Sequence, residues 1–199
     1  NYRGAAPINW AIINGEKETG VTTFFLKHEI DTGDIIMQEK ESILIEDNAE
    51  TLYNRLKLKG SELVLKTVYA IRKGQVPAKP QKYSDNIPTA PKIFKETCKI
   101  DWDKTSFEIL NFIRGLSPYP AAWTHLDGKI CKIYRASIVN SPGIKKTSET
   151  TYITDNKTYL YFLTKDGALA IEELQAEGKK RMLIDEFLRG CKLLCYYPS

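Results

Sequence analysis

The chain has 199 residues, of which 42% are hydrophobic, so it can build one large or two small domains with packed cores. Its formal net charge of +4 is mild and permits a polyanionic partner without requiring one. No apolar run approaches the ~18 residues that a membrane-spanning helix needs, and residues 1–4 do not follow the pattern of a signal peptide. We therefore expect a cytoplasmic globular protein with neither a membrane nor DNA as its partner.

The cysteines and histidines do not follow a metal-binding pattern. The four cysteines contain no Cys-x-x-Cys pair, and both histidines lie far from them in the sequence. Such spacing favours reduced thiols and argues against a zinc site. We expect no bound metal at these six residues: Cys98, Cys131, Cys191, Cys195, His28 and His125.

The first predicted element is a helix over 6–14, which Pro7 opens and Gly15 ends. β-Branched and aromatic residues then predict a strand over 21–26, and a second strand is expected over 34–43.

The polar cluster Asp31-Thr32-Gly33-Asp34 lies between these two strands. We expect Asp31 at the end of a buried strand, where an α/β sheet commonly presents its chemistry. Gly33 would supply the positive φ of a tight return. An aspartate that only hydrogen-bonds its own turn is the alternative interpretation.

A long helix is predicted to follow, ending at Lys73 before Gly74. Asp47 or Asn48 supplies the expected carboxylate or amide N-cap, and Glu50 lies three residues after Asp47, as in a capping box. Five apolar residues form the expected buried stripe, and Gly60 on the same face would allow close approach to the sheet. The stripe consists of Leu52, Leu56, Leu63, Val64 and Ile71.

Residues 75–91 hold four prolines and show neither helical nor strand periodicity, which is typical of a linker. We place a first domain at 1–82, the linker at 83–91 and a second domain at 92–199.

The second domain begins with a helix and continues with strands. Thr105 and Glu108 form a capping box, and Ser117-Pro118-Tyr119-Pro120 ends that helix. Asp127-Gly128 and Asp166-Gly167 each separate two strand patterns, as in β-hairpins. Short strands at this spacing predict a small barrel or sandwich. A last helix is expected over 184–189.

Several motifs taken together resemble the methionyl-tRNA formyltransferase family, and the resemblance covers nearly the whole chain. They are Arg3-Gly4-Ala5-Ala6-Pro7-Ile8, Gly20-Val21-Thr22 leading to Asp31-Thr32-Gly33-Asp34, Ile100-Asp101-Trp102, the stretch from Arg114 to Trp123, and Glu177-Gly178-Lys179-Lys180-Arg181-Met182. The resemblance implies an α/β protein with part of a Rossmann-like formyltransferase domain, followed by an oligonucleotide-binding-like (OB-like) β-barrel.

The family also carries an Asn-x-His-x-Ser-Leu-Leu-Pro segment immediately before its Arg-Gly-Ala-Ala-Pro stretch, whereas this sequence begins at Asn1, after that segment. We therefore expect the C-terminal portion of such a protein, without the catalytic Asn and His, and inactive by itself. The complete protein is expected to be a monomer. The shortened one is expected to associate through exposed sheet edges.

The resemblance implies formyl transfer from 10-formyltetrahydrofolate to the amino group of initiator methionyl-tRNA. Asp31 matches the family's catalytic carboxylate, and the backbone of His28, Glu29 and Ile30 matches a loop that faces the pterin. An exposed turn without a ligand is the alternative for this loop. Neither His28 nor His125 is expected to act as the catalytic base.

Basic residues provide candidate tRNA contacts. Two sets are singled out because clustered cations can follow a phosphate backbone, although each side chain alone could be an ordinary surface charge. Trp102, Trp123 and Tyr119 could stack on nucleotides, but the core is the favoured place for them. The two sets are Lys92, Lys95 and Lys99, and Lys179, Lys180 and Arg181.

Two alternative functions stay open. The first is formyl transfer to a small amine, such as a purine precursor or an amino-sugar nucleotide, against which the basic stretch 177–182 argues. The second is an RNA-binding module without catalysis. A formyl-transfer assay beside a tRNA-binding assay separates them.

Overall fold

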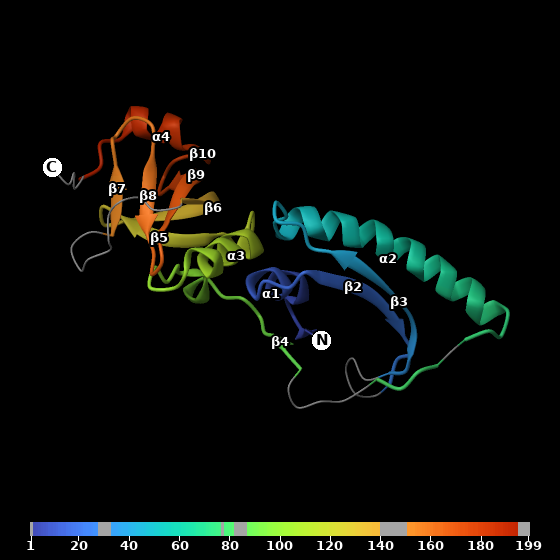
Figure 1. Cartoon of the computed structure of the whole chain (residues 1–199). Helices are drawn as coiled ribbons and strands as arrows, with labels where there is room; N and C mark the ends of the chain where they lie inside the picture. The colour runs from blue at the N-terminus through green and yellow to red at the C-terminus, as the bar shows by residue number, and fades with distance from the viewer. Residues whose placement is uncertain (1, 28–32, 77, 82–86, 140–150, 195–199) are drawn as a thin grey trace. The chain divides into compact units, whose positions relative to one another are not determined.

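The computed structural model describes residues 2–27, 33–76, 78–81, 87–139 and 151–194 (Figure 1). The chain divides into two compact units. The first unit contains residues 1–11 and 16–92, and the second contains residues 12–15 and 93–199. Helices and strands occur in both, so the expected α/β class is confirmed.

The first unit contains a short parallel strand pair and a helix-covered hairpin. Gly4 pairs with Ala90, and a Cβ at Gly4 would lie 2.2 Å from the Ala90 carbonyl oxygen, so only glycine fits there. The elements are β1 (Arg3–Gly4), α1 (Pro7–Ile13), β2 (Glu18–Phe24), β3 (Ile35–Ser42), α2 (Ala49–Arg72) and β4 (Thr89–Ala90).

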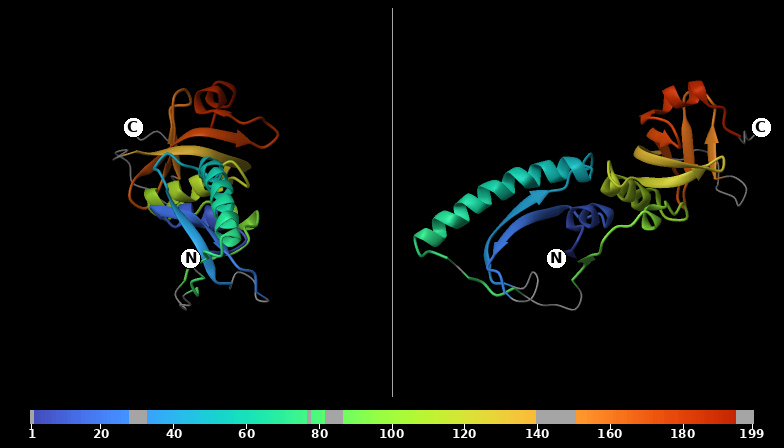
Figure 2. Two further views of the ribbon diagram at one scale, coloured as in Figure 1. Left: turned by 90° about the vertical axis from the view of Figure 1, so that its right-hand side faces the viewer. Right: turned by 180° about the vertical axis from the view of Figure 1, so that it is seen from behind.

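Helix α2 lies along the antiparallel β2–β3 hairpin (Figure 2). Leu52, Leu56 and Leu63 are buried as expected. The prediction was wrong for Val64 and Ile71, which are 52% and 46% exposed, because these two positions turn away from the hairpin. Strand β2 alternates exposed and half-buried residues and is therefore not the buried strand expected.

Of the two expected capping residues, Asn48 is the N-cap of α2. The Asn48 side chain accepts hydrogen bonds from the N–H groups of Glu50 and Thr51, both at 3.0 Å, and the Thr51 hydroxyl accepts the Asn48 N–H. The capping box therefore begins one residue later than expected. Asp47 is free to turn inward, where it is 2% exposed.

The second unit is built on an antiparallel sheet of six strands in the order β5-β6-β9-β8-β7, with β10 also paired to β9. Its elements are η1 (Glu96–Cys98), α3 (Ser106–Leu116), β5 (Ala122–Leu126), β6 (Lys129–Val139), β7 (Tyr152–Thr154), β8 (Leu160–Leu163), β9 (Ala168–Ala176), β10 (Met182–Leu183) and α4 (Ile184–Gly190).

Both predicted hairpins of this unit are confirmed. Asp127 and Gly128 join β5 to β6 with φ of 48° and 76°, the left-handed geometry that a two-residue turn requires. Register shifts at Arg135 bend β6, which allows the sheet to curve. One edge of β9 pairs with β6, while β8 and β10 share the other edge.

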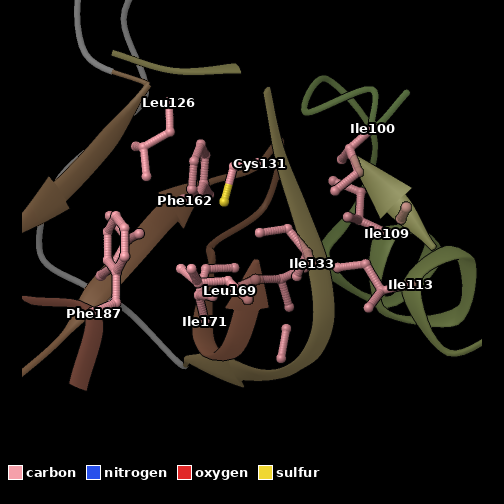
Figure 3. Packing of buried hydrophobic residues seen from close by; sticks show 14 of the residues in the cluster. Ile100, Ile109, Ile113, Leu126, Cys131, Ile133, Phe162, Leu169, Ile171 and Phe187 are labelled. Carbon is pink, nitrogen blue, oxygen red and sulfur yellow. The ribbon is translucent and has the colours of Figure 1, made fainter. Parts of the chain in front are cut away.

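The core of the second unit fills the concave side of this sheet (Figure 3). Ile109 and Ile113 of α3 contribute to it, opposite Ile133, Phe162 and other buried residues of the strands. The Thr105–Glu108 capping box that starts α3 is present as predicted. None of the helices in the described part of the chain is long and apolar enough to cross a membrane.

Candidate functional site

The residues that the sequence places at the catalytic loop, Asp31, His28, Glu29 and Ile30, lie outside the described residues. The structure does describe the two ends of the loop that joins β2 and β3, residues 24–27 and 33–35, which we call the loop neck. The Phe25 N–H donates to the Asp34 carbonyl at 3.0 Å, and Lys27 Nζ pairs with Asp34 Oδ1, also at 3.0 Å.

Gly33 is required at the loop neck by the close approach of another backbone. Its expected positive φ depends also on Thr32, which lies outside the described residues, so that part stays a prediction. A Cβ at Gly33 would lie 1.4 Å from the Phe25 carbonyl oxygen. Close approach of the two backbones therefore requires glycine here.

Lys79 and Gln81, which follow α2, form hydrogen bonds to the loop neck. Ile35 and Lys79 exchange two backbone hydrogen bonds, of 2.8 and 2.9 Å. The Gln81 side-chain amide donates to the Gly33 carbonyl at 2.7 Å, and its oxygen accepts from Arg3 Nη2. A residue of the Arg-Gly-Ala-Ala-Pro motif is thereby linked through Gln81 to the backbone two residues after Asp31.

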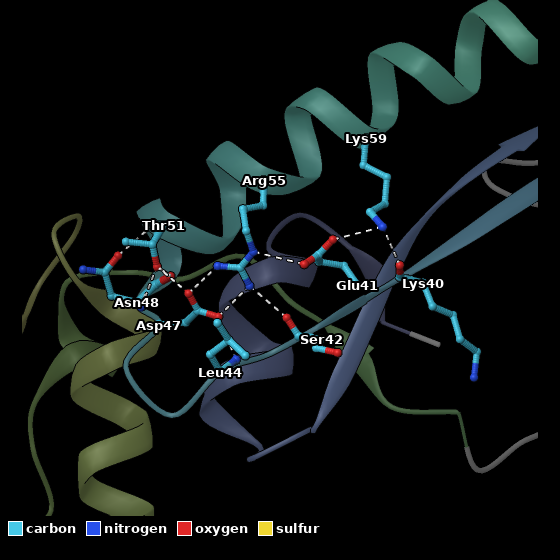
Figure 4. A network of polar contacts seen from close by, with 9 residues as sticks. All are labelled: Lys40, Glu41, Ser42, Leu44, Asp47, Asn48, Thr51, Arg55 and Lys59. Atoms are coloured by element: carbon cyan, nitrogen blue, oxygen red, sulfur yellow. Dashed lines mark hydrogen bonds and ion pairs between the residues drawn. The ribbon is translucent and has the colours of Figure 1, made fainter.

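A polar network attaches α2 to the end of β3 (Figure 4). Arg55 donates to both Asp47 oxygens at 2.6 and 2.7 Å, and to Glu41 at 3.0 Å. Burial raises the pKa of Asp47, but hydrogen bonds from Arg55, the Leu44 N–H and Thr51 outweigh it, so that the net shift is downward. The charged groups of this network are paired with one another, so we assign the network a structural role.

The basic cluster at 179–181 lies in the turn between β9 and β10, and all three residues are exposed. Arg181 is held by Glu173 of β9, with Nε and Nη2 donating at 2.7 and 2.6 Å to the two carboxylate oxygens. Its guanidinium carbon also lies 4.3 Å from the centre of the Tyr134 ring. Arg181 is therefore in a different environment from that of Lys179 and Lys180.

The second basic set precedes α3, and Lys92, Lys95 and Lys99 are exposed. The Lys95 carbonyl accepts the Trp123 indole N–H at 2.7 Å, and Lys99 Nζ lies 5.9 Å from the Trp123 ring centre.

A row of paired residues connects Lys99 with Lys179 across the outer face of the sheet. Lys99 pairs with Trp123, Trp123 is opposite Lys132, and Lys132 is opposite Gln175. The Gln175 side chain then donates to the Lys179 carbonyl at 2.9 Å. Directly opposite residues share one face of a sheet, so Lys99 and Lys132 lie on one face, and the row ends at the turn that carries Lys179.

Tyr134 was not identified from the sequence, and Lys132 was considered there only as one of the cations that lie between the two basic sets, together with Arg114, Lys129 and Arg135. The signal that could have identified them is the period-two alternation of β6, in which Cys131 and Ile133 face the core. The intervening side chains then belong to the outer face.

The three aromatic candidates have different environments. Trp102 stacks on Phe162 with ring centres 4.2 Å apart and belongs to the core as expected. Trp123 is half-buried and makes an edge contact with His125. Tyr119 is 83% exposed, so its favoured assignment to the core was wrong.

The chain matches two family models, one described as formyl transferase over residues 1–68 and one described as formyl transferase, C-terminal domain, over residues 92–192. A methionyl-tRNA formyltransferase from Phocaeicola vulgatus is 51% identical over 198 residues. That alignment covers 95% of this chain and 60% of the relative, so the chain spans about 60% of the length of such relatives.

Two solved structures share the fold. HypX from Aquifex aeolicus in complex with tetrahydrofolic acid has a TM-score of 0.69 and 22% identity, covering 99% of this chain and 35% of that protein. The N-formyltransferase from Helicobacter canadensis in complex with folinic acid and dTDP-3-aminofucose has a TM-score of 0.67 and 24% identity, with coverages of 92% and 62%. Since family models match residues in both units and a relative is 51% identical, the chain belongs to the formyltransferase family.

Proposed function

We propose that the chain is part of a cytoplasmic enzyme that transfers the formyl group of 10-formyltetrahydrofolate to the amino group of initiator methionyl-tRNA at the start of translation. The observation that carries this proposal is the 51% identity to a methionyl-tRNA formyltransferase along 95% of the chain. The 24% identity to an enzyme bound to an amino-sugar nucleotide supports a common fold alone.

In this proposal Asp31 provides the catalytic carboxylate. Attack by the amine requires the loss of a proton, and a carboxylate can accept it through water or stabilise a nearby protonated imidazole. The donor, when bound, would supply the formyl carbon, whose oxygen would become negative during the attack. The amine nitrogen would form a new bond to that carbon, the bond from the carbon to the folate nitrogen would break, and the departing folate nitrogen would take up a proton. The contacts of Gly33 with Phe25 and Gln81 support this assignment, since they restrain the backbone beside Asp31.

We assign the pterin-facing backbone of the same loop to His28, Glu29 and Ile30. Among the described residues, the side chains at the loop neck bind one another or the backbone, as in the Lys27–Asp34 ion pair and the Gln81–Gly33 hydrogen bond. The folate donor is therefore proposed from family membership and from the position of the loop, and no catalytic step is derived from its bound geometry.

The tRNA is assigned to the basic outer face of the second unit. In the second unit Lys132 lies between Lys99 and the turn that carries Lys179, and we propose that these cations follow a phosphate backbone. Arg181 contributes to the same surface in a way developed below. The proposed contacts on this unit are Lys95, Lys99, Lys179, Lys180 and Arg181, and Lys92, which belongs to the first unit, is a further proposed contact.

A chimeric enzyme tests the proposal. Residues 1–199 would replace the matching region of the Phocaeicola vulgatus relative, and formyl transfer would be measured with methionyl-tRNA and with dTDP-3-aminofucose as acceptors. We expect transfer to methionyl-tRNA alone. Transfer to the sugar nucleotide alone would contradict the substrate, and tRNA binding without transfer to either acceptor would favour a binding module.

A further inference from the structure

Three residues of the second unit form a layered arrangement on the outer face of the sheet. The Tyr134 ring belongs to β6, and the Arg181 guanidinium lies over it at 4.3 Å from the ring centre. Glu173 of β9 accepts two hydrogen bonds from Arg181, of 2.7 and 2.6 Å. Such paired bonds run along the edge of the guanidinium and fix its plane.

The ring beneath Arg181 is fixed as well. The Tyr134 hydroxyl donates to Gln175 at 2.8 Å, and the Gln175 amide donates to the Lys179 carbonyl at 2.9 Å. The same glutamine therefore positions the ring and the turn that carries Lys179 and Lys180. The Arg181 side chain remains 42% exposed although it makes these contacts.

This arrangement is poorly suited to a phosphate contact by Arg181. Glu173 already neutralises the guanidinium, and a phosphate would have to displace a carboxylate that makes two charge-assisted hydrogen bonds. Lys179 and Lys180 lie in the same turn and are exposed. The counterion release that drives phosphate binding is therefore expected from the two lysines.

We propose that Arg181, held over the Tyr134 ring by Glu173, is a platform on which an unpaired RNA base stacks, while Lys179 and Lys180 contact the adjoining phosphates. RNA-binding proteins commonly stack splayed bases on aromatic rings and on guanidinium planes. The inference rests on the RNA partner of the proposed function. In it, Arg181 contacts RNA by presenting its planar guanidinium to a base, and not by neutralising a phosphate.

The test measures the affinity of the full chain for initiator tRNA against salt concentration. In Arg181→Lys the charge remains and the flat surface is lost. We expect about tenfold weaker binding at every salt concentration, with the logarithmic salt slope unchanged. In Lys179→Ala/Lys180→Ala we expect the slope to flatten by about 1.4 to 1.8, which corresponds to two lost phosphate contacts.

Arg135→Lys is the matched control. Arg135 Nε pairs with Glu172 at 2.7 Å on the same two strands, and the described residues place no aromatic ring against it. It should bind like the unmodified chain. Tyr134→Phe keeps the ring but loses the hydroxyl bond to Gln175, so it should weaken binding less than Tyr134→Leu. Tyr134→Leu should weaken binding about as much as Arg181→Lys.

The outcomes separate the two proposals. If Arg181→Lys keeps full affinity while Arg181→Ala loses about one phosphate contact from the slope, Arg181 is a charge contact and the platform is wrong. Equal weakening by Arg135→Lys and Arg181→Lys would also contradict the platform. If the unmodified chain shows no salt-dependent binding of tRNA, the assignment of RNA to this face fails, and the platform fails with it.

Discussion

Arg55 and Asp47 meet in a two-point ion pair, with Nη1 to Oδ1 at 2.6 Å and Nη2 to Oδ2 at 2.7 Å. The Asp47 side chain is 3% exposed and the Arg55 side chain 33%, so the arginine shields the carboxylate from water. Because Arg55 lies on α2 and Asp47 in the loop after β3, the pair fixes the start of the helix against the hairpin.

We expect Arg55→Ala to lower the stability of the first unit by about 2–4 kcal/mol, since it leaves the buried Asp47 carboxylate without its counter-charge. Hydrogen exchange of the α2 amides measures this locally. Lys40→Ala is the control, because it removes an ion pair with Glu18 whose side chains are 78% and 58% exposed. Equal protection of the α2 amides in both variants would show that the Arg55 network does not stabilise the unit.

Gly33 and Gly60 should respond in opposite directions to alanine. Gly33→Ala places a Cβ 1.4 Å from the Phe25 carbonyl oxygen, so the backbone must move and the hairpin is destabilised. At Gly60 the new Cβ would meet Val21 at an ordinary 3.7 Å, and helix α2 should gain about 1 kcal/mol. Thermal unfolding of the two variants checks this. A stable Gly33→Ala protein with unchanged hairpin amide shifts would contradict the close approach.

We expect the second unit to lose stability in acid as the Asp155 carboxylate becomes protonated. Burial raises its pKa, but the Thr158 hydroxyl and the N–H groups of Thr158, Lys157 and Tyr159 outweigh burial, so the net shift is downward. A carboxyl with a lowered folded-state pKa contributes stability above about pH 4, and this contribution is lost as the pH falls. Urea unfolding of Asp155→Asn should therefore show a weaker pH dependence between about pH 4 and pH 2. Asp185→Asn, which removes an exposed charge on α4, controls for net charge.

The proposed boundary predicts that residues 92–199 fold without residues 1–82. Residues 12–15 belong to the second unit although they precede the proposed boundary, so the test shows whether the unit needs them to fold. Expression of 92–199 should give dispersed amide signals and cooperative unfolding. If folding requires that 12–15 be present, the boundary drawn from the prolines is incomplete.

Local chemistry explains why much of the fold could be predicted from the sequence. The Asp127-Gly128 turn and the Thr105–Glu108 capping box depend on neighbours within a few residues, and both are confirmed. Asp47 and Asn48 are both good capping residues, and the choice between them depends on Arg55, two helical turns away. The sequence next to residues 47 and 48 carries no signal of that contact with Arg55.

The same distinction between local and long-range contacts applies to the candidate site. Exposed lysines in turns could be found from composition, but the pairing of Arg181 with Glu173 depends on how β10 returns along β9. The close backbone approach that requires glycine at position 33 likewise depends on Phe25 across the loop. Contacts between distant segments therefore account for the errors in assigning roles.

The catalytic role of Asp31 is the central claim, and the formyl-transfer rate of the chimeric enzyme with Asp31→Asn tests it most directly. The account predicts a fall in turnover of about 10²- to 10⁴-fold, because proton transfer loses its carboxylate, with tRNA affinity unchanged. Asp34→Asn, on the same loop neck, should keep turnover within a few-fold of normal. Normal turnover of Asp31→Asn would contradict the assignment.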